Sequence, residues 1–176
     1  MQFIIPLILG LASGGLSLSG FSKVCGFTGH LGCTDMSNYL LPGIIFGIAV
    51  LVYLGILRLS FPLSKSLGFI VLSGLGYYIA WLITFSSFSI LAFVGGIIGT
   101  FIMCLGLLLL GVIKIGQGGR ITFFGGLLTC VFFLPQLFNQ TVISEHTMLV
   151  AFFLIWQSGI MLAIAYFAKK NMQEKI

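Results

Sequence analysis

The sequence has very few charged residues. Lysine, arginine, aspartate and glutamate make up 6% of its 176 positions, whereas apolar residues make up 59%. A soluble domain carries about a quarter charged residues, so this chain has too little polar material to cover a water-facing surface. The scarcity of charge therefore predicts a protein that lies in lipid.

The sequence also lacks a cluster of basic residues. The formal net charge is +5, but the eight lysines and arginines are scattered singly or in pairs between apolar runs. Domains that bind nucleic acids gather such residues on one face or along one stripe. We therefore expect the lipid bilayer, and no nucleic acid, as a partner.

No lysine, arginine, aspartate or glutamate falls inside the long apolar runs. Ionisable residues at membrane depth mark ion and proton pathways, so their absence argues against a proton-coupled pump or a rotary-motor subunit. Catalysis at that depth needs a nucleophile with a base, a metal cluster or paired acids, and the runs offer only Cys, Ser and Thr without a base. The sequence thus predicts no enzymatic activity, no cofactor and no metal site.

The apolar runs themselves have the length of membrane spans. Residues 88–113 contain no charge over 26 positions, which at about 1.5 Å per residue exceeds a hydrocarbon core of about 30 Å. The runs lack period-2 alternation, which favours helices over a barrel. We predict one all-α integral membrane domain, residues 1–176, with six spans at residues 3–19, 40–57, 66–84, 88–113, 121–138 and 146–168.

The first run has a rival interpretation. Its short apolar core, followed by small residues, is also typical of a cleaved signal peptide, although it has no basic residue before the core. In that case five spans remain. Between the spans we expect a long polar loop at Phe21–Tyr39 and a basic turn at Lys114–Arg120, with Pro42 in the first turn of the second helix and a short polar tail from Lys169.

The basic residues are distributed asymmetrically. If the six spans alternate in direction, only Lys23 falls on one side of the membrane, opposite the other seven basic residues. An excess of lysine and arginine marks the cytoplasmic side. We therefore expect both termini in the cytoplasm, in a bacterial inner membrane. The seven residues on the predicted cytoplasmic side are Arg58, Lys65, Lys114, Arg120, Lys169, Lys170 and Lys175.

Four residues capable of binding metal lie in the first polar loop, on the predicted outer side: Cys25, His30, Cys33 and Asp35. Their spacing matches no familiar zinc site, and thiols on the oxidising side of a membrane tend to pair. A disulfide between Cys25 and Cys33 is the favoured interpretation, with unpaired thiols as the next alternative and a metal site well behind.

The polarity that remains within the spans is neutral. Gln157 falls near the centre of the sixth span, and Gln136 follows Pro135 late in the fifth. A glutamine at this depth either lines a polar pathway or hydrogen-bonds to a neighbouring helix, and the second role is the commoner one.

Glycine is abundant, with 24 residues. Pairs with GxxxG spacing put two missing side chains on one helix face, so that a second helix can approach closely. We expect these faces to pack mainly within the chain, with dimerisation through one face as an alternative. The pairs are Gly10 with Gly14, Gly43 with Gly47, and Gly95 with Gly99.

Two functions are compatible with these features. The first expectation is a non-enzymatic accessory, scaffold or assembly subunit of a membrane complex, bound to a membrane-protein partner or to further copies of itself. The alternative is a small permease or channel for a neutral or weakly polar solute, which would use the glutamines and the glycine-lined helices.

Overall fold

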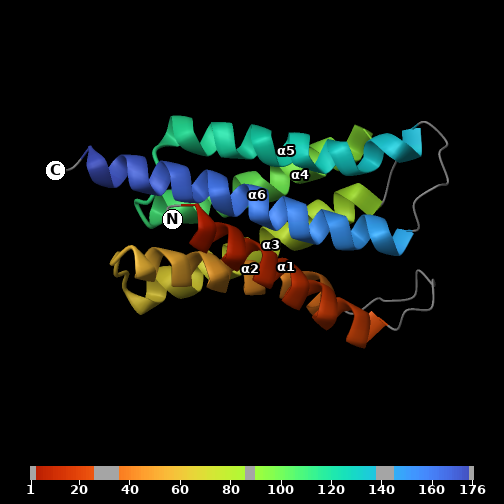
Figure 1. Ribbon diagram of the computed structural model, residues 1–176, viewed down its shortest axis with the longest axis horizontal. Helices are drawn as coiled ribbons and strands as arrows, with labels where there is room; N and C mark the ends of the chain where they lie inside the picture. The colour runs from red at the N-terminus through yellow and green to blue at the C-terminus, as the bar shows by residue number, and fades with distance from the viewer. Residues whose placement is uncertain (1–2, 26–35, 86–89, 138–144, 175–176) are drawn as a thin grey trace.

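The chain is described by a computed structural model. The model describes residues 3–25, 36–85, 90–137 and 145–174, with side chains described at residues 3–18, 40–83, 93–130 and 153–174. In these residues the structure is all-helical, with six helices and no strand (Figure 1). The helices are α1 (Ile4–Cys25), α2 (Met36–Ile56), α3 (Leu63–Phe85), α4 (Ile90–Leu109), α5 (Ile115–Leu137) and α6 (Glu145–Gln173).

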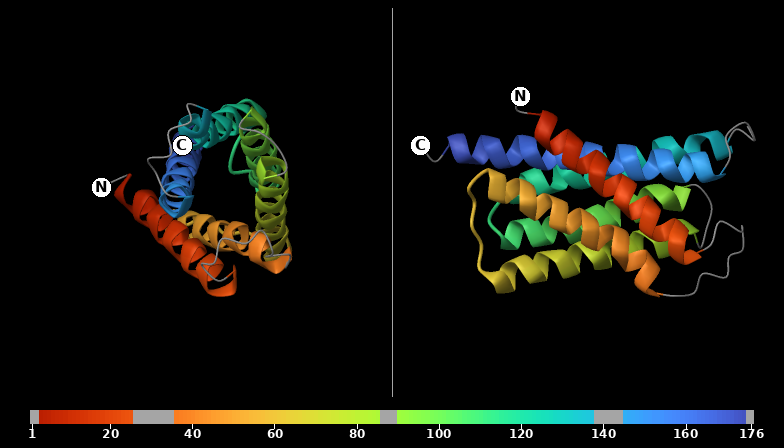
Figure 2. Two further views of the ribbon diagram at one scale, coloured as in Figure 1. Left: turned by 90° about the vertical axis from the view of Figure 1, so that its right-hand side faces the viewer. Right: turned by 60° about the horizontal axis from the view of Figure 1, so that its bottom comes forward.

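The helices form a closed ring. Each helix packs against its neighbours in the chain, and α6 returns to pack against α1. Viewed along the helices, the chain runs once around this ring, with α1 crossing α6 at the point of closure (Figure 2). Six helices in alternating directions bring both termini toward the same end of the ring (Figure 1).

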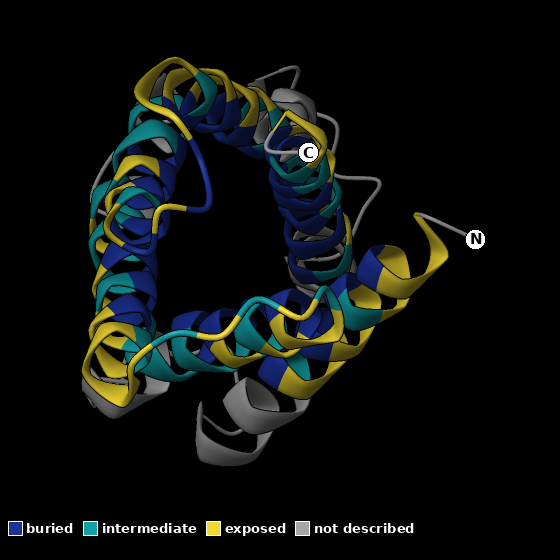
Figure 3. Ribbon diagram, turned by 90° about the vertical axis from the view of Figure 1, so that its left-hand side faces the viewer, coloured by how far each residue is buried: buried dark blue, intermediate teal, exposed yellow. Residues whose placement is uncertain are grey.

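Burial divides every helix into an inner and an outer face (Figure 3). The buried side chains that fill the interior are almost all apolar, and they include Phe46, Leu54, Phe69, Phe153 and Ile160. Large apolar side chains are also exposed on the outside of all six helices. Among these exposed residues are Ile8, Val52, Val71, Phe101, Phe123 and Ile155.

One helical segment in the described residues is long and apolar enough to cross a membrane by itself, namely Leu63–Ile83 of α3. Three shorter apolar segments lie in α1, α2 and α4, at Ile4–Leu18, Leu40–Ile56 and Phe93–Leu109. The described residues therefore have the expected helix class, with six helices as predicted.

The turn between α4 and α5 lies earlier than predicted. The helix expected to continue to residue 113 ends at Leu109, because Gly111 adopts a left-handed conformation with φ of 70°. The Gly111 N–H donates to the Leu108 carbonyl (2.9 Å) and the Val112 N–H to the Leu107 carbonyl (3.0 Å). This pair of bonds satisfies carbonyls at the helix end in the Schellman pattern.

The predicted basic turn at Lys114–Arg120 is also wrong. From Ile115 onward these residues form the first turns of α5. Lys114 precedes the helix, and its N–H donates to Oε1 of Gln117, three residues later, at 2.8 Å. A glutamine at this position reaches back to the residue before the helix, as in a capping box. The three glycines of this segment suggested a turn, but the cap starts the helix before them.

Gly111 gives a stability prediction with a matched control. Alanine at φ of 70° is strained, so Gly111→Ala should lower the free energy of unfolding by about 1 kcal/mol. Gly119 lies in α5 with nothing near its missing Cβ, so Gly119→Ala should raise stability by up to about 1 kcal/mol. Melting temperatures measured in mild detergent should fall in Gly111→Ala and rise in Gly119→Ala. Equal effects of the two changes would contradict the left-handed turn.

Several predicted boundaries also need correction. α1 continues to Cys25 and α2 begins at Met36, so the expected loop Phe21–Tyr39 is helical at both ends. Pro42 is consequently the seventh residue of α2, beyond its first turn, where it removes one backbone hydrogen bond. The tail expected from Lys169 is instead the last turn of α6, which runs to Gln173.

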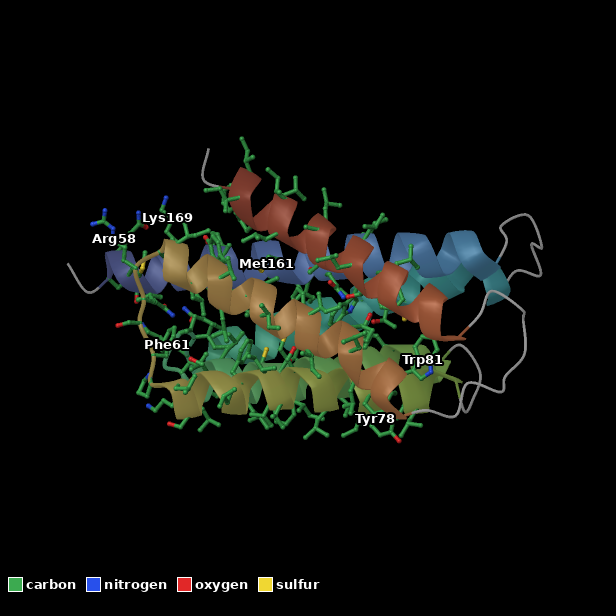
Figure 4. All side chains as sticks on the ribbon, turned by 90° about the horizontal axis from the view of Figure 1, so that it is seen from below. Arg58, Phe61, Tyr78, Trp81, Met161 and Lys169 are labelled. Atoms are coloured by element: carbon green, nitrogen blue, oxygen red, sulfur yellow. The ribbon has the colours of Figure 1, made fainter. Side chains whose placement is uncertain are left out.

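The basic residues gather at one end of the ring. Arg58 lies after α2 and Lys169 near the end of α6, and Figure 4 shows both at the end where the chain terminates. Tyr78 and Trp81 lie at the opposite end in the same view. Arg58 and Lys169, both expected on the same side of the membrane, therefore lie at the same end of the ring, in line with the alternation expected from the sequence.

Candidate functional site

Gln157 is the most deeply buried amide among the described residues. Its side chain is 0% exposed and lies inside the ring, on α6. The Nε2 group donates to Oγ of Ser17 on α1, which is also 0% exposed, at 3.1 Å. Gln157 therefore joins the two helices that close the ring. No feature of the sequence singled out Ser17 as its partner.

The other end of the Gln157 amide has no hydrogen-bond partner among the described residues. The Tyr77 side chain of α3 lies close enough to Gln157 for the two polar groups to interact, although neither the Tyr77 hydroxyl nor Oε1 of Gln157 makes a hydrogen bond of good geometry with a described residue. A buried polar group without a partner costs about 1–3 kcal/mol.

Aromatic rings surround these two groups. The ring of Tyr77 stacks on Phe153, with centroids 5.8 Å apart and an interplanar angle of 11°, and meets Trp156 edge-on at 5.7 Å. Phe46 of α2 lies 5.9 Å from Trp156. The indole Nε1 of Trp156 donates to the Gly125 carbonyl of α5 at 3.3 Å. We call Phe46, Tyr77, Phe153, Trp156 and Gln157 the central site.

Three further buried hydroxyls have no partner among the described residues: Thr100 on α4, Thr122 on α5 and Ser158 on α6. By contrast, the hydroxyls of Ser13 and Thr129 donate to carbonyls of their own helices, at 2.9 Å each. The buried polar side chains among the described residues are therefore neutral, and several of them, such as Thr100 against Gly125 and Ser158 against Gly10, lie where two helices meet.

The glycine pair of α1 packs against α6. A Cβ on Gly10 would lie 2.5 Å from Cα of Ser158, and one on Gly14 would lie 2.8 Å from the carbonyl oxygen of Phe153. Backbone atoms cannot move aside as a side chain can, so these two positions hold α1 directly on α6. This contact brings Ser17 within reach of Gln157.

The glycine pair of α2 faces α3 in a similar way. A Cβ on Gly43 would lie 2.7 Å from Cβ of Tyr77, and one on Gly47 would lie 3.1 Å from Cβ of Ser73. The Ser73 hydroxyl also donates to the Gly43 carbonyl at 2.7 Å. The close contact between α2 and α3 therefore sets the position of Tyr77.

The third pair is divided between two neighbours. Gly99 of α4 meets Gly76 of α3, where a Cβ would lie 2.7 Å from the Gly76 carbonyl oxygen. Gly95 is buried, and the adjacent Gly96 meets Thr129 of α5. The GxxxG pattern compares positions within one helix. It did not point to Gly76 or Gly96, because the small residue that each of them meets lies on a neighbouring helix.

A second polar cluster closes the basic end of the ring. Asn171 of α6, 9% exposed, donates through Nδ2 to the Val112 carbonyl (2.9 Å) and to Oε1 of Gln117 (2.8 Å). Gln117 returns a bond from Nε2 to Oδ1 of Asn171 at 2.7 Å. Val112 and Ile113 are buried, and the connection between α4 and α5 bends inward over the mouth of the ring (Figure 3). We call Val112, Lys114, Gln117, Asn171 and Glu174 the end cluster.

The end cluster contains an ion pair between Nζ of Lys114 and Oε2 of Glu174, at 2.6 Å. The hydrogen bond and the charge of Lys114 lower the pKa of the Glu174 carboxyl from its usual value. The stabilisation is therefore present above the pKa of an unfolded glutamate and is lost as the pH falls through the lower, folded value. The effect should be small, because both groups are exposed to water.

This pH dependence can be measured with one variant. Melting temperatures of the wild type and of Glu174→Gln should converge once the pH falls below the lowered pKa of Glu174, because the protonated carboxyl no longer pairs with Lys114. Between pH 6 and pH 8 the wild type should be slightly more stable, and high salt should reduce that difference. A difference that persists at low pH would contradict the ion pair as its source.

Two candidate sites from the sequence lie outside the described residues. Cys33 belongs to residues 26–35, and the side chains of Cys25 and Gln136 are likewise outside the described part, although both residues belong to helices. The disulfide between Cys25 and Cys33 and a pathway role for Gln136 therefore stay predictions.

Comparison of the chain with protein-family models, with curated protein sequences and with solved structures finds no match.

Proposed function

We propose that the chain is an integral membrane protein of six spans, placed in a bacterial cytoplasmic membrane with both termini on the cytoplasmic side. The observation that carries this proposal is the apolar exterior, since all six helices expose large apolar side chains outward. In water, each Å² of this exposed apolar surface would cost about 25 cal/mol of free energy. In lipid it is the expected surface of a helical bundle.

Helix length and charge support the same placement. The shortest helix, α4, has 20 residues, which extend about 30 Å and match the thickness of a hydrocarbon core. The basic residues at one end, Arg58 and Lys169 among them (Figure 4), suit the cytoplasmic face and its anionic headgroups.

The membrane placement has a direct test. The protein should stay in the membrane fraction after extraction at high pH, and a Gln173→Cys thiol, in a variant with the native cysteines replaced by serine, should react only with permeant reagents in intact cells. Release at high pH would reject the spans. Labelling by an impermeant reagent would reverse the proposed sidedness.

For the function, the central site favours the alternative suggested by the sequence, a small permease or channel for a neutral or weakly polar solute. The observation is that the Tyr77 hydroxyl and Oε1 of Gln157, both buried, make no hydrogen bond of good geometry with any residue that the structure describes. A scaffold needs no such groups, and an apolar core would be more stable in their place. A solute with its own donor and acceptor would complete the hydrogen bonds that the chain leaves open.

The accessory or assembly subunit stays the second candidate, and a surface feature favours it. Phe101 of α4 and Phe123 and Phe124 of α5 are all exposed on the outside of adjacent helices. Aromatic side chains are frequent anchors in protein contacts. Extraction of the protein from its host in mild detergent, followed by mass spectrometry, would decide: a stoichiometric larger partner supports the subunit, and a lone monomer or homo-oligomer supports the permease.

A further inference from the structure

We propose that the connection between α4 and α5, residues 110–114, is a movable strap that opens and closes the basic end of the ring, and that the last turns of α6 hold it closed. Such a strap controls access to the interior from one end, whether the chain is a permease or an accessory subunit. It is therefore independent of the proposed function.

The strap lies across the mouth of the ring. It bends inward over the opening at the basic end (Figure 3), and the side chains of Leu110, Val112 and Ile113 are buried. Gly111 and Lys114 of the same segment are exposed. The strap thus turns its apolar side chains toward the interior and its charged side chain outward, as a cover over an apolar core does.

Cys104 of α4 lies behind this cover. A Cβ on Gly118, in the first turns of α5, would lie 3.6 Å from Cδ1 of Ile113 and 3.8 Å from Cβ of Cys104. The Ile113 and Cys104 side chains therefore pack at the same position of α5. Because Cys104 is only 1% exposed, the reactivity of its thiol reports whether water reaches the interior past the strap.

Glycines at both ends of the strap favour movement. On the α4 side, Gly111 has φ of 70°, a conformation that glycine adopts without strain. On the α5 side, Gly116 and Gly119 have nothing within 4 Å of their missing Cβ atoms. Glycine weakens a helix, so the first turns of α5 unwind more easily than turns of other residues would, and the strap can then swing outward.

The end of α6 supplies side chains that hold the strap closed. Asn171 donates to the Val112 carbonyl at 2.9 Å and makes two bonds with Gln117. Oε1 of Gln117 also accepts from the Lys114 N–H at 2.8 Å, so Gln117 joins the strap, the start of α5 and the end of α6. Lys114 forms the ion pair with Glu174. Hydrogen bonds and exposed ion pairs have a small net strength beside water, so these contacts can break and form again while the helices stay folded.

The experiment measures how fast a charged, water-soluble thiol reagent modifies Cys104 in lipid nanodiscs, with the other three cysteines replaced by serine. A charged reagent does not cross lipid, so it reaches the thiol only from water. Asn171→Leu should speed the reaction at least tenfold, because the loss of its bonds raises the share of molecules with an open strap. Glu174→Gln should speed it about twofold, since the ion pair is exposed to water.

Two controls separate opening of the strap from general loosening of the ring. Gln173→Leu changes an exposed residue at the same end of α6 and should leave the rate unchanged. Ser17→Cys puts a thiol at a buried position of α1, further from the basic end, in a chain whose four native cysteines are serine. That thiol should react slowly with and without Asn171→Leu.

A cross-link tests the attachment to α6 directly. Lys114→Cys and Glu174→Cys together place two thiols at the positions of the ion pair, and a bifunctional thiol reagent of matching length then joins the strap to α6. In Asn171→Leu this cross-link should return the rate of Cys104 modification to the wild-type value. Either cysteine substitution alone, treated with the same reagent, should leave the rate high.

Each outcome decides the proposal. Faster modification of Cys104 that the cross-link reverses would support the strap. A folded Asn171→Leu protein with an unchanged rate would overturn it, since the buried apolar side chains would then hold the segment in place by themselves. Equal acceleration at Cys104 and at the Ser17→Cys thiol, or acceleration that the cross-link does not reverse, would also overturn it, because the whole ring would then be loosened.

Discussion

Replacement of Gly14 by leucine should open the ring between α1 and α6. A Cβ at this position would already lie 2.8 Å from the Phe153 carbonyl oxygen and 3.1 Å from Cα of Leu154. These are backbone atoms of α6, so the added side chain can be accommodated only if the helices separate. We expect a loss of about 3 kcal/mol in the free energy of unfolding, at the upper end of the usual effect of overpacking.

The adjacent residue provides the control. Gly15 is exposed and has nothing within 4 Å of its missing Cβ, so Gly15→Leu adds the same side chain on the outer face of α1. That variant should keep the wild-type stability, or gain slightly from a better helix former. SDS titration of both variants in mild detergent would give the comparison. Similar losses in the two would show that α1 does not pack on α6 through this face.

The same change should also affect the central site. Ser17 is on α1, one turn beyond Gly14, and it holds one end of the Gln157 amide at 3.1 Å. If α1 moves away, the amide loses its hydrogen bond to Ser17 and is held less firmly in position. A solute pathway should then lose selectivity in Gly14→Leu and keep it in Gly15→Leu, which connects the packing face to the proposed function.

The sequence predicted the helices well because their signals are local. Runs of apolar residues, separated by charges and glycines, give the number of helices and their alternation, and hence the basic end. The residues at which the helices end were harder to predict. α4 ends at Leu109, just before the left-handed Gly111, while α2 ends at Ile56 through the same pattern of bonds with Arg58 at φ of 61°. No glycine marks that second turn.

The central site could be predicted only in part. Gln157 stands out because an amide in an apolar run needs a partner, but the partner comes from a residue 140 positions away. Nothing in the sequence distinguishes Tyr77 from the other aromatic residues of its apolar run. Its hydroxyl matters because Gly43 and Gly47 hold α2 close to α3, and apolar runs without clear periodicity do not reveal which face of a helix turns inward. The order of helices around the ring was for this reason not predicted.

Replacement of Asn171 by leucine should release the connection between α4 and α5 from the end of α6. The Asn171 side chain bonds to the Val112 carbonyl and makes two bonds with Gln117, at 2.7–2.9 Å. Leucine has the same branched shape and number of side-chain heavy atoms as asparagine but makes none of these bonds, so the Val112 carbonyl and Nε2 of Gln117 lose their partner where water is scarce. At about 1–3 kcal/mol for each polar group left unpaired, we expect a total loss of about 3 kcal/mol.

A local measurement distinguishes this release from general unfolding. Hydrogen exchange at the backbone amides of residues 110–119 should become faster in Asn171→Leu, while amides in the middle of α3 exchange as in the wild type. Gln173→Leu, an exposed change two residues later in α6, should leave both exchange and stability within about 0.5 kcal/mol of the wild type. Unchanged exchange in Asn171→Leu would mean that the apolar burial of Val112 and Ile113 holds the connection in place without the end cluster. Faster exchange confined to this segment would show that one side chain of α6 keeps the basic end of the ring closed.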